Sequence, residues 1–125
     1  MVNEDLERWE LAREPEDLAR FFVMRANAGD ADGLVALYEP DAVLAGPDGQ
    51  VMRGAEAIRD YYAGLLASRP KFVAGQQRPA LRRGDIALTS SRLVNGRVTA
   101  EVARRQPDGT WRWAIDQPAV AQEIP

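Results

Sequence analysis

The chain has 125 residues, 46% of them hydrophobic and 28% charged, which is typical of a single globular domain spanning residues 1–125. It contains neither cysteine nor histidine, which excludes disulfides, thiolate nucleophiles, serine–histidine–aspartate triads and zinc or haem sites. Acid–base chemistry therefore falls to Asp, Glu, Tyr, Arg or the one lysine, Lys71. No apolar run approaches the ~20 residues of a membrane span, and Met1–Arg13 is acidic rather than a signal peptide, so we expect a cytoplasmic protein.

The net charge of −3 is unevenly distributed along the chain. Residues 1–62 hold 6 basic and 14 acidic side chains, whereas residues 63–125 hold 10 and 5. The acids could simply favour helix starts, or the basic half could form an anion-attracting sheet face or a contact between subunits. The arginines alternate along the predicted strands instead of forming a continuous stripe, so we do not expect nucleic-acid binding.

The first third of the chain predicts helices. Asn3 could cap a short helix through Ala12, so residues 1–14 could be a loosely attached N-terminal helix. Pro15 suits the start of a clearer helix that ends at Gly29. Asp30 then caps a second helix, which we expect to end at Pro40.

The middle of the chain predicts a short hairpin, a third helix and a long strand. The hairpin joins residues 42–45 and 50–52 through a turn at 46–49. Gly54 leads into a helix that we expect to end by Pro70. Residues 71–83 then form the first strand of the main sheet, with Pro79 implying an edge or a bulge.

The last third predicts three consecutive antiparallel strands, over residues 86–94, 97–106 and 111–117. Asn95-Gly96 and Asp108-Gly109 suggest two-residue type I′ turns, which would fix the register of both hairpins.

That register predicts the two faces of the sheet. It pairs Arg92 with Thr99, Ser90 with Glu101 and Leu88 with Ala103 in the first hairpin. In the second hairpin it pairs Arg105 with Arg112, Ala103 with Ala114 and Glu101 with Asp116. One face then carries Leu88, Ser90, Arg92, Glu101, Ala103, Ala114 and Asp116. The other face carries Leu93, Val98, Ala100, Val102, Arg104, Trp111, Trp113 and Ile115.

Helices followed by a long antiparallel sheet describe an α+β fold. The run from Asn27 to Tyr38 (NAGDADGLVALY), with Asp41-Ala42-Val43-Leu44 and Gly54–Arg59 (GAEAIR), resembles the nuclear transport factor 2-like superfamily. The ending Asp108–Asp116 (DGTWRWAID) is similar to its small bacterial members. The superfamily includes ketosteroid isomerases and SnoaL-like polyketide cyclases.

The resemblance implies a curved antiparallel sheet wrapped around about three helices, with a conical apolar cavity between them and frequent homodimers. It does not supply a complete mechanism. Where ketosteroid isomerases have an acidic base before a proline, this chain has Gly46 before Pro47. Their oxyanion-hole tyrosine matches Phe22, and their protonated acid falls near Glu101. SnoaL-like cyclases use Asp with His, and this chain has no His.

The predicted site is a close pair of carboxyl groups, Glu101 and Asp116, as acid–base catalysts. In a dry cavity one of them would keep its proton and stand as a donor beside a carboxylate acceptor. If this face is instead wet, Arg92, Arg105 and Arg112 would pair the acids, and the more apolar opposite face would be the core. The expected ligand is an apolar oxygenated small molecule, and its predicted contacts are Phe22, Leu44, Met52, Tyr62, Leu88, Ser90, Arg92 and Ala114.

The leading functional hypothesis is a ligand-binding protein that is an isomerase or cyclase, and the alternative is a non-catalytic binding or dimerisation module. We expect no cofactor and no metal. A homodimer should form through the face with Val98, Val102, Trp111, Trp113 and Ile115, because such a patch is larger than monomers usually expose.

Overall fold

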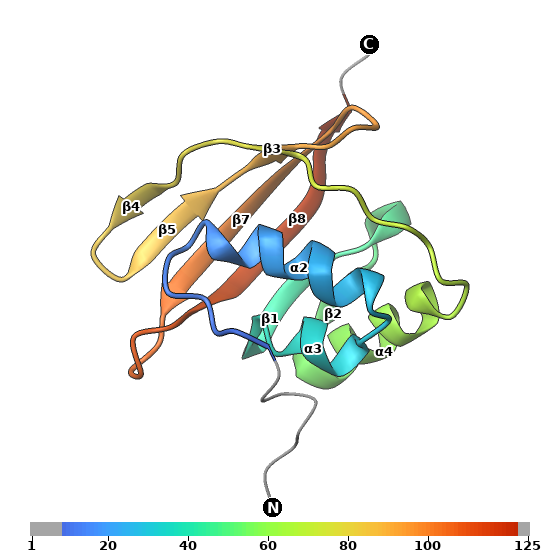
Figure 1. Cartoon of the computed structure of the whole chain (residues 1–125), viewed down its shortest axis with the longest axis horizontal. Helices are drawn as coiled ribbons and strands as arrows, with labels where there is room; N and C mark the ends of the chain where they lie inside the picture. Colours follow the sequence, from blue (N-terminus) through green and yellow to red (C-terminus); the bar gives the residue numbers. More distant parts are fainter. Residues whose placement is uncertain (1–8, 123–125) are drawn as a thin grey trace, which may run out of the picture.

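The computed structural model describes residues 9–122. Within these residues, three α-helices cover one face of a curved, open sheet, which confirms the α+β prediction (Figure 1). The helices are α2 (Asp17–Asn27), α3 (Ala31–Val35) and α4 (Ala55–Leu66), with a 3-10 turn, η1 (Pro47–Gly49). The strands are β1 (Tyr38–Ala45), β2 (Val51–Arg53), β3 (Gln76–Gln77), β4 (Leu81–Arg83), β5 (Ile86–Thr89), β6 (Ser91–Arg92), β7 (Arg97–Arg105) and β8 (Trp111–Gln122). None of the helices in this part of the chain is long and apolar enough to cross a bilayer.

The helices follow the predicted signals closely. Asp30 caps α3 by accepting a hydrogen bond from the Gly33 backbone nitrogen at 2.9 Å. The second helix is shorter than predicted, because the chain is already extended at Tyr38 and Pro40 lies inside β1. Pro40 falls where the pairing of β1 with β8 shifts register, so its missing N–H breaks no ladder bond there. The predicted helix over residues 3–12 lies mostly outside the described residues, and residues 9–12 are not helical.

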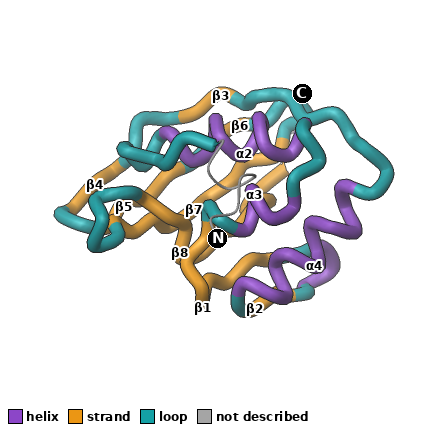
Figure 2. Tube along the Cα trace, turned by 60° about the horizontal axis from the view of Figure 1, so that its bottom comes forward, coloured by secondary structure: helices purple, strands orange, loops and turns teal. Residues whose placement is uncertain are grey.

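The sheet is mixed rather than purely antiparallel. Its order is β2-β1-β8-β7-β5-β4, and β1 pairs with β8 in parallel. Parallel neighbours need a long connection, and most of the chain lies between these two strands. The predicted strand over residues 71–83 is also interrupted, with β3 and β4 separated by a stretch that contains Pro79. Figure 2 shows the extended segment before β3 running past α2 toward the edge of the sheet.

Both hairpin turns differ from the prediction by one residue. Gly96 and Gly109 have positive φ, but the only non-glycine residues with positive φ in the described chain are Asp48 and Arg69. The turns are therefore three-residue loops in which glycine supplies the left-handed position, rather than type I′ turns. Hydrogen bonds close them from Leu93 to Arg97 and from Gln106 to Thr110.

The longer turns shift the pairing of β5 with β7 by one residue. Glu101 lies opposite Thr89 instead of Ser90, and Leu88 lies opposite Val102 instead of Ala103. A one-residue slip moves every side chain to the other face. The predicted positions of Leu88, Ser90 and Arg92 on the face of Glu101 are therefore wrong, and Ala87, Thr89 and Ser91 lie there instead.

The second hairpin begins with the same shift, which a bulge then reverses. Ala103 pairs with Trp113 rather than with Ala114, and Arg104 rather than Arg105 pairs with Arg112. The register changes between Val102 and Ala103, so that Val102 pairs with Ile115 and Glu101 pairs with Asp116 as predicted.

This shift places both strand tryptophans inside the protein. Trp111 is 2% exposed and Trp113 is 4% exposed, so the prediction that they form a dimer surface is wrong. They pack with α2, α3 and α4 in the core, whose members include Leu18, Phe21, Leu34, Tyr38, Leu44, Ile58 and Tyr62. The outer face instead carries Leu88, Val102 and Ile115 in one row across three strands.

Candidate functional site

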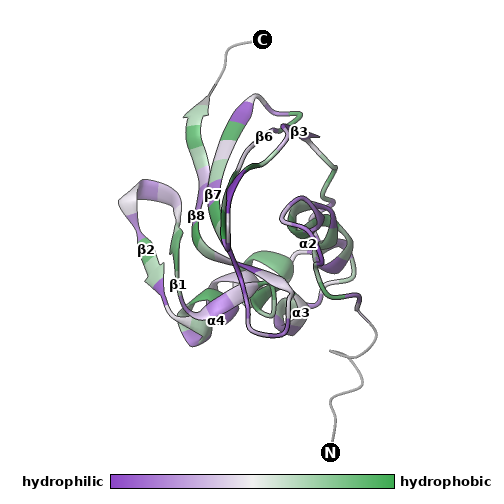
Figure 3. Ribbon diagram, turned by 90° about the vertical axis from the view of Figure 1, so that its left-hand side faces the viewer, coloured by the Kyte–Doolittle hydropathy of each residue, from purple (hydrophilic) through white to green (hydrophobic). Residues whose placement is uncertain are grey.

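A cavity of about 570 Å³ lies between the helices and the inner face of the sheet. Figure 3 shows α2 standing away from β6 and β7 at this place. Its walls come from α2, α4, the extended segment before β3, and strands β6, β7 and β8. The lining residues are Ala19, Arg20, Phe22, Val23, Met24, Tyr61, Tyr62, Leu65, Phe72, Val73, Ala74, Gly75, Gln77, Ser91, Leu93, Arg97, Thr99, Glu101, Trp113, Asp116 and Pro118.

The cavity has a buried floor and an exposed rim. Buried lining residues are Tyr62, Ser91, Thr99, Glu101, Trp113 and Asp116. Exposed lining residues are Arg20, Met24, Leu65, Val73, Ala74 and Arg97. The floor therefore carries mainly polar side chains, and the rim carries two arginines. The walls between floor and rim are mainly apolar. Cavities of roughly this size hold drug-sized ligands in other proteins.

Glu101 and Asp116 face each other across β7 and β8 at the floor. They are 7% and 6% exposed, and neither forms an ion pair within the part of the chain that the structure describes. Arg105, which could have neutralised the pair, instead contacts Asp85. The wet-face alternative is therefore wrong for the described residues, because both carboxyl groups are buried without a basic partner.

The surroundings of the pair favour protonation. Burial raises the pKa of Glu101, while hydrogen bonding by Thr99 and Thr89 opposes this rise. The Thr89 hydroxyl donates to Glu101 Oε1 at 2.7 Å. Burial, followed by the negative charge of Glu101, raises the pKa of Asp116 from 3.8 to about 7, although the Tyr38 hydrogen bond lowers it. Near neutral pH the floor therefore holds a proton that it can give up or take back.

Two tyrosines extend this site away from the sheet. The Tyr38 hydroxyl donates to Asp116 Oδ2 at 2.5 Å, and it lies 2.7 Å from the Tyr62 hydroxyl. Because Tyr38 has only one hydroxyl hydrogen, Tyr62 must be the donor to Tyr38 when Asp116 is ionised. Burial, and then the charge of Asp116, raise the pKa of both tyrosines, so both remain neutral.

Backbone packing fixes the positions of these tyrosines. Tyr38 begins β1, directly after Leu37, whose carbonyl accepts a hydrogen bond from the Trp113 backbone nitrogen at 2.8 Å. Tyr62 lies one helical turn after Ile58 on the buried side of α4. The Phe22 and Tyr62 rings pack in a T-shaped arrangement, with 5.6 Å between the ring centres.

One buried polar atom beside the cavity lacks a partner. The indole nitrogen Nε1 of Trp113 is buried and has no hydrogen-bond partner in the described structure. An unpaired buried donor costs about 1–3 kcal/mol.

Four of the predicted site residues line the cavity: Phe22, Tyr62, Glu101 and Asp116. The other six do not line it. Leu44 of β1 and Met52 of β2 lie in the core, and Ala114 is at the bulge of β8. Leu88 and Arg92 are exposed, and the Ser90 hydroxyl is bonded to the Thr99 carbonyl.

Sequence reasoning missed Tyr38, Thr89, Thr99 and Trp113. The tyrosine was assigned to a helix, although Pro40 two residues later argues for extended backbone there. Thr89 and Trp113 lie one residue from the chosen positions Leu88 and Ala114, on the face opposite to the one that two-residue turns predict. Thr99 lies on the face predicted for Glu101, but it is not among the predicted contacts.

We expect the protein not to depend on a metal ion. No group of three Asp or Glu side chains in the described part of the chain is arranged to hold one. Two carboxylates alone make a poor cage for magnesium or calcium. The melting temperature should be unchanged by EDTA, and a marked fall that magnesium or calcium reverses would contradict this prediction.

Comparisons with known proteins agree with this architecture. The family model described as SnoaL-like domain matches residues 18–121. The chain is similar to a putative calcium/calmodulin-dependent protein kinase type II association domain from Thiobacillus denitrificans, with 18% identity and a TM-score of 0.69. That match covers 88% of this chain and 98% of the other. It is similar to a ketosteroid isomerase-like protein from Erwinia carotovora atroseptica, with 21% identity and a TM-score of 0.63, over 93% and 95% of the two chains. It is also similar to a protein of unknown function with a cystatin-like fold from Nostoc punctiforme, with 21% identity and a TM-score of 0.65, over 88% and 90%.

Proposed function

Since the chain belongs to the family of SnoaL-like domains, within the nuclear transport factor 2-like superfamily, we propose that it binds an apolar oxygenated small molecule and catalyses a proton transfer on it. The reaction class is an isomerisation or a cyclisation. The observation that carries this proposal is the pair formed by Glu101 and Asp116, two buried carboxyl groups without a basic partner at the floor of a cavity.

The pair can act in both directions of a proton transfer. The ionised carboxylate of the pair can remove a proton from a carbon or oxygen atom of the ligand, and the carboxyl group that keeps its proton can return one to another atom of the same ligand. With a pKa of about 7, Asp116 is a stronger base than an ordinary carboxylate and is still substantially ionised at neutral pH.

A general probe of carboxylate bases tests the catalytic half of the proposal. In 5-nitrobenzisoxazole, a base removes the proton on C3, the N–O bond breaks, and a coloured cyanophenolate forms. We expect the wild-type protein to accelerate this elimination, with a rate that rises with pH around a midpoint near 7. Asp116→Asn should reduce the rate by about 100-fold, as removal of a positioned base usually does.

Asp41→Asn is the matched control, because it removes a carboxylate from an exposed position of β1. It should leave the rate unchanged.

Binding of 2-naphthol, followed by its fluorescence, tests the ligand-binding half separately. If 2-naphthol binds but the elimination is no faster than with free acetate, the non-catalytic alternative is favoured. That alternative draws support from two residues that differ from the ketosteroid isomerase pattern. Gly46 stands in place of the acidic base, and Phe22 stands in place of the oxyanion-hole tyrosine.

We also propose that two copies pair through the outer face of the sheet. Leu88 and Ile115 are 47% and 52% exposed and lie in one row with Val102. The wild-type protein should be a dimer at micromolar concentration by light scattering, and Ile115→Asp should make it monomeric. Val94→Asp changes an exposed valine in a hairpin loop and should leave the dimer intact. A monomeric wild-type protein would contradict this prediction.

A further inference from the structure

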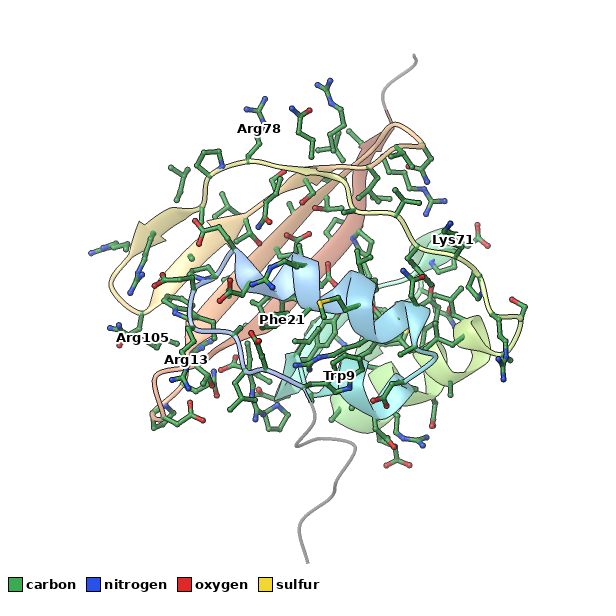
Figure 4. The ribbon with its side chains drawn as sticks, viewed as in Figure 1. Trp9, Arg13, Phe21, Lys71, Arg78 and Arg105 are labelled. Atoms are coloured by element: carbon green, nitrogen blue, oxygen red, sulfur yellow. The ribbon has the colours of Figure 1, made fainter. Side chains whose placement is uncertain are left out.

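Two arginines at the rim of the cavity are not used by the proposed reaction. Arg20 comes from α2 and Arg97 from β7, so they approach the opening from different walls. Among the described residues that line the cavity, they are the only basic ones. Lys71 and Arg78 belong to the neighbouring extended segment, but their side chains point outward (Figure 4) and do not line it.

Arg97 is the freer of the two. Its backbone nitrogen donates to Asn95 Oδ1 at 3.0 Å, and its guanidinium has no ion pair with the described residues. Arg20 already contacts Asp17 Oδ1 at 3.1 Å and lies 4.6 Å from the centre of the Phe21 ring. An anion at the rim would therefore meet an unneutralised charge at Arg97 and a partly neutralised one at Arg20.

The charges along β7 have a fixed order. Arg97, Thr99 and Glu101 occupy every second position of the strand, so all three line the same cavity. Of these three, only Arg97 is exposed. At about 3.3 Å per residue, the strand carries the Cα atoms of Arg97 and Glu101 roughly 13 Å apart. The cavity is thus cationic at the rim and acidic at the floor, with mainly apolar walls between.

We propose that the ligand is an organic anion: a largely apolar molecule with a carboxylate that binds Arg97 and a second oxygen that reaches Asp116. This inference rests on the proposed function and specifies its substrate class. Arg20 contributes to the same carboxylate subsite from the opposite wall. Phe22, Val23 and Phe72 line the part of the cavity that would hold the apolar body.

The electrostatics select one orientation of such a ligand. A carboxylate at the floor would be repelled by the negative charge that Glu101 and Asp116 carry at neutral pH, and it would be stripped of water. At the rim the carboxylate keeps part of its hydration and can accept two parallel hydrogen bonds from a guanidinium. The reactive oxygen is then directed to the floor. The basic excess of residues 63–125 agrees with an anion-attracting entrance.

Two fluorescent compounds of equal size test the inference. 6-Hydroxy-2-naphthoate has a carboxylate and a hydroxyl at opposite ends, and 6-hydroxy-2-naphthamide replaces the carboxylate by a neutral amide. In titrations at pH 7 and low salt, we expect the carboxylate to bind at least about fivefold more tightly than the amide. This advantage should shrink as salt is added, because the rim is exposed.

Arg97→Gln should remove most of the advantage while leaving the affinity for the amide unchanged. Arg20→Gln should remove a smaller part. Arg83→Gln is the matched control, since Arg83 is an exposed strand arginine that does not line the cavity, and it should keep the full advantage.

Equal affinities for the two compounds in the wild-type protein would overturn the anion inference and leave the proposed function standing, because the amide would still be bound. A carboxylate advantage that survives in both arginine variants would overturn it too. If neither compound nor 2-naphthol binds, both the inference and the proposed function fail.

Discussion

Asp116→Asn is expected to stabilise the protein, and to do so more at pH 8 than at pH 5. The folded-state pKa of Asp116 is raised from 3.8 to about 7, so the folded protein holds this proton more tightly than the unfolded chain does. The stability that the proton contributes is fully present below about pH 4 and is lost as the pH rises through about 7. Asparagine keeps the shape of the neutral acid and never carries the charge.

The stabilising effect of Asp116→Asn should be larger at pH 8 than at pH 5 by on the order of 2 kcal/mol. Denaturant melts of both proteins at the two pH values measure this. Asp41→Asn should show no comparable difference, because it changes an exposed acid. An effect of Asp116→Asn that is equal at both pH values would mean that Asp116 is ionised or solvated in the folded protein, and would remove the basis of the proposed site. The expected loss of proton transfer together with a gain in stability is typical of functional groups held in unfavourable surroundings.

The fold was predictable from sequence because its signals are local and redundant. The Asp30 cap, the apolar spacing of α4 and the glycine turns each specify an element without knowledge of the rest. The register of the sheet was not predictable in the same way. Asn-Gly and Asp-Gly are compatible with both two-residue and three-residue loops, and the choice between them moves every following side chain to the other face.

The Glu101–Asp116 pair was nevertheless predicted correctly, because two errors cancelled. The three-residue turn at Gly109 shifts β8 by one residue, and the bulge beside Ala103 shifts it back before Asp116 is reached. No residue in this stretch signals a bulge, since neither glycine nor proline occurs between Trp111 and Asp116. For the six predicted contacts that do not line the cavity, no second error restored the predicted position, or the residue lies in an element outside this hairpin.

Tyr38→Phe is expected to destabilise the protein, and here too the effect should depend on pH. The substitution removes the hydroxyl that donates to Asp116 and accepts from Tyr62, all within the buried core. At pH 8, where Asp116 is ionised, the loss should be about 1–3 kcal/mol, because a buried charge is left without its donor. At pH 5 the carboxyl group is neutral, and the loss should be smaller.

Tyr61→Phe is the matched control for this substitution. Tyr61 is half-buried next to Tyr62, and its hydroxyl has no hydrogen bond in the described structure, so the change should stay within about 0.5 kcal/mol. Since the Tyr38 hydrogen bond lowers the pKa of Asp116, its removal should move the carboxyl titration to higher pH, which carbon NMR can follow. A loss of stability in Tyr38→Phe that is the same at pH 5 and pH 8, with no change in that titration, would assign the role of Tyr38 to packing alone. In the double variant with Asp116→Asn, the pH-dependent part of the loss should disappear, because the charge that Tyr38 stabilises is then absent.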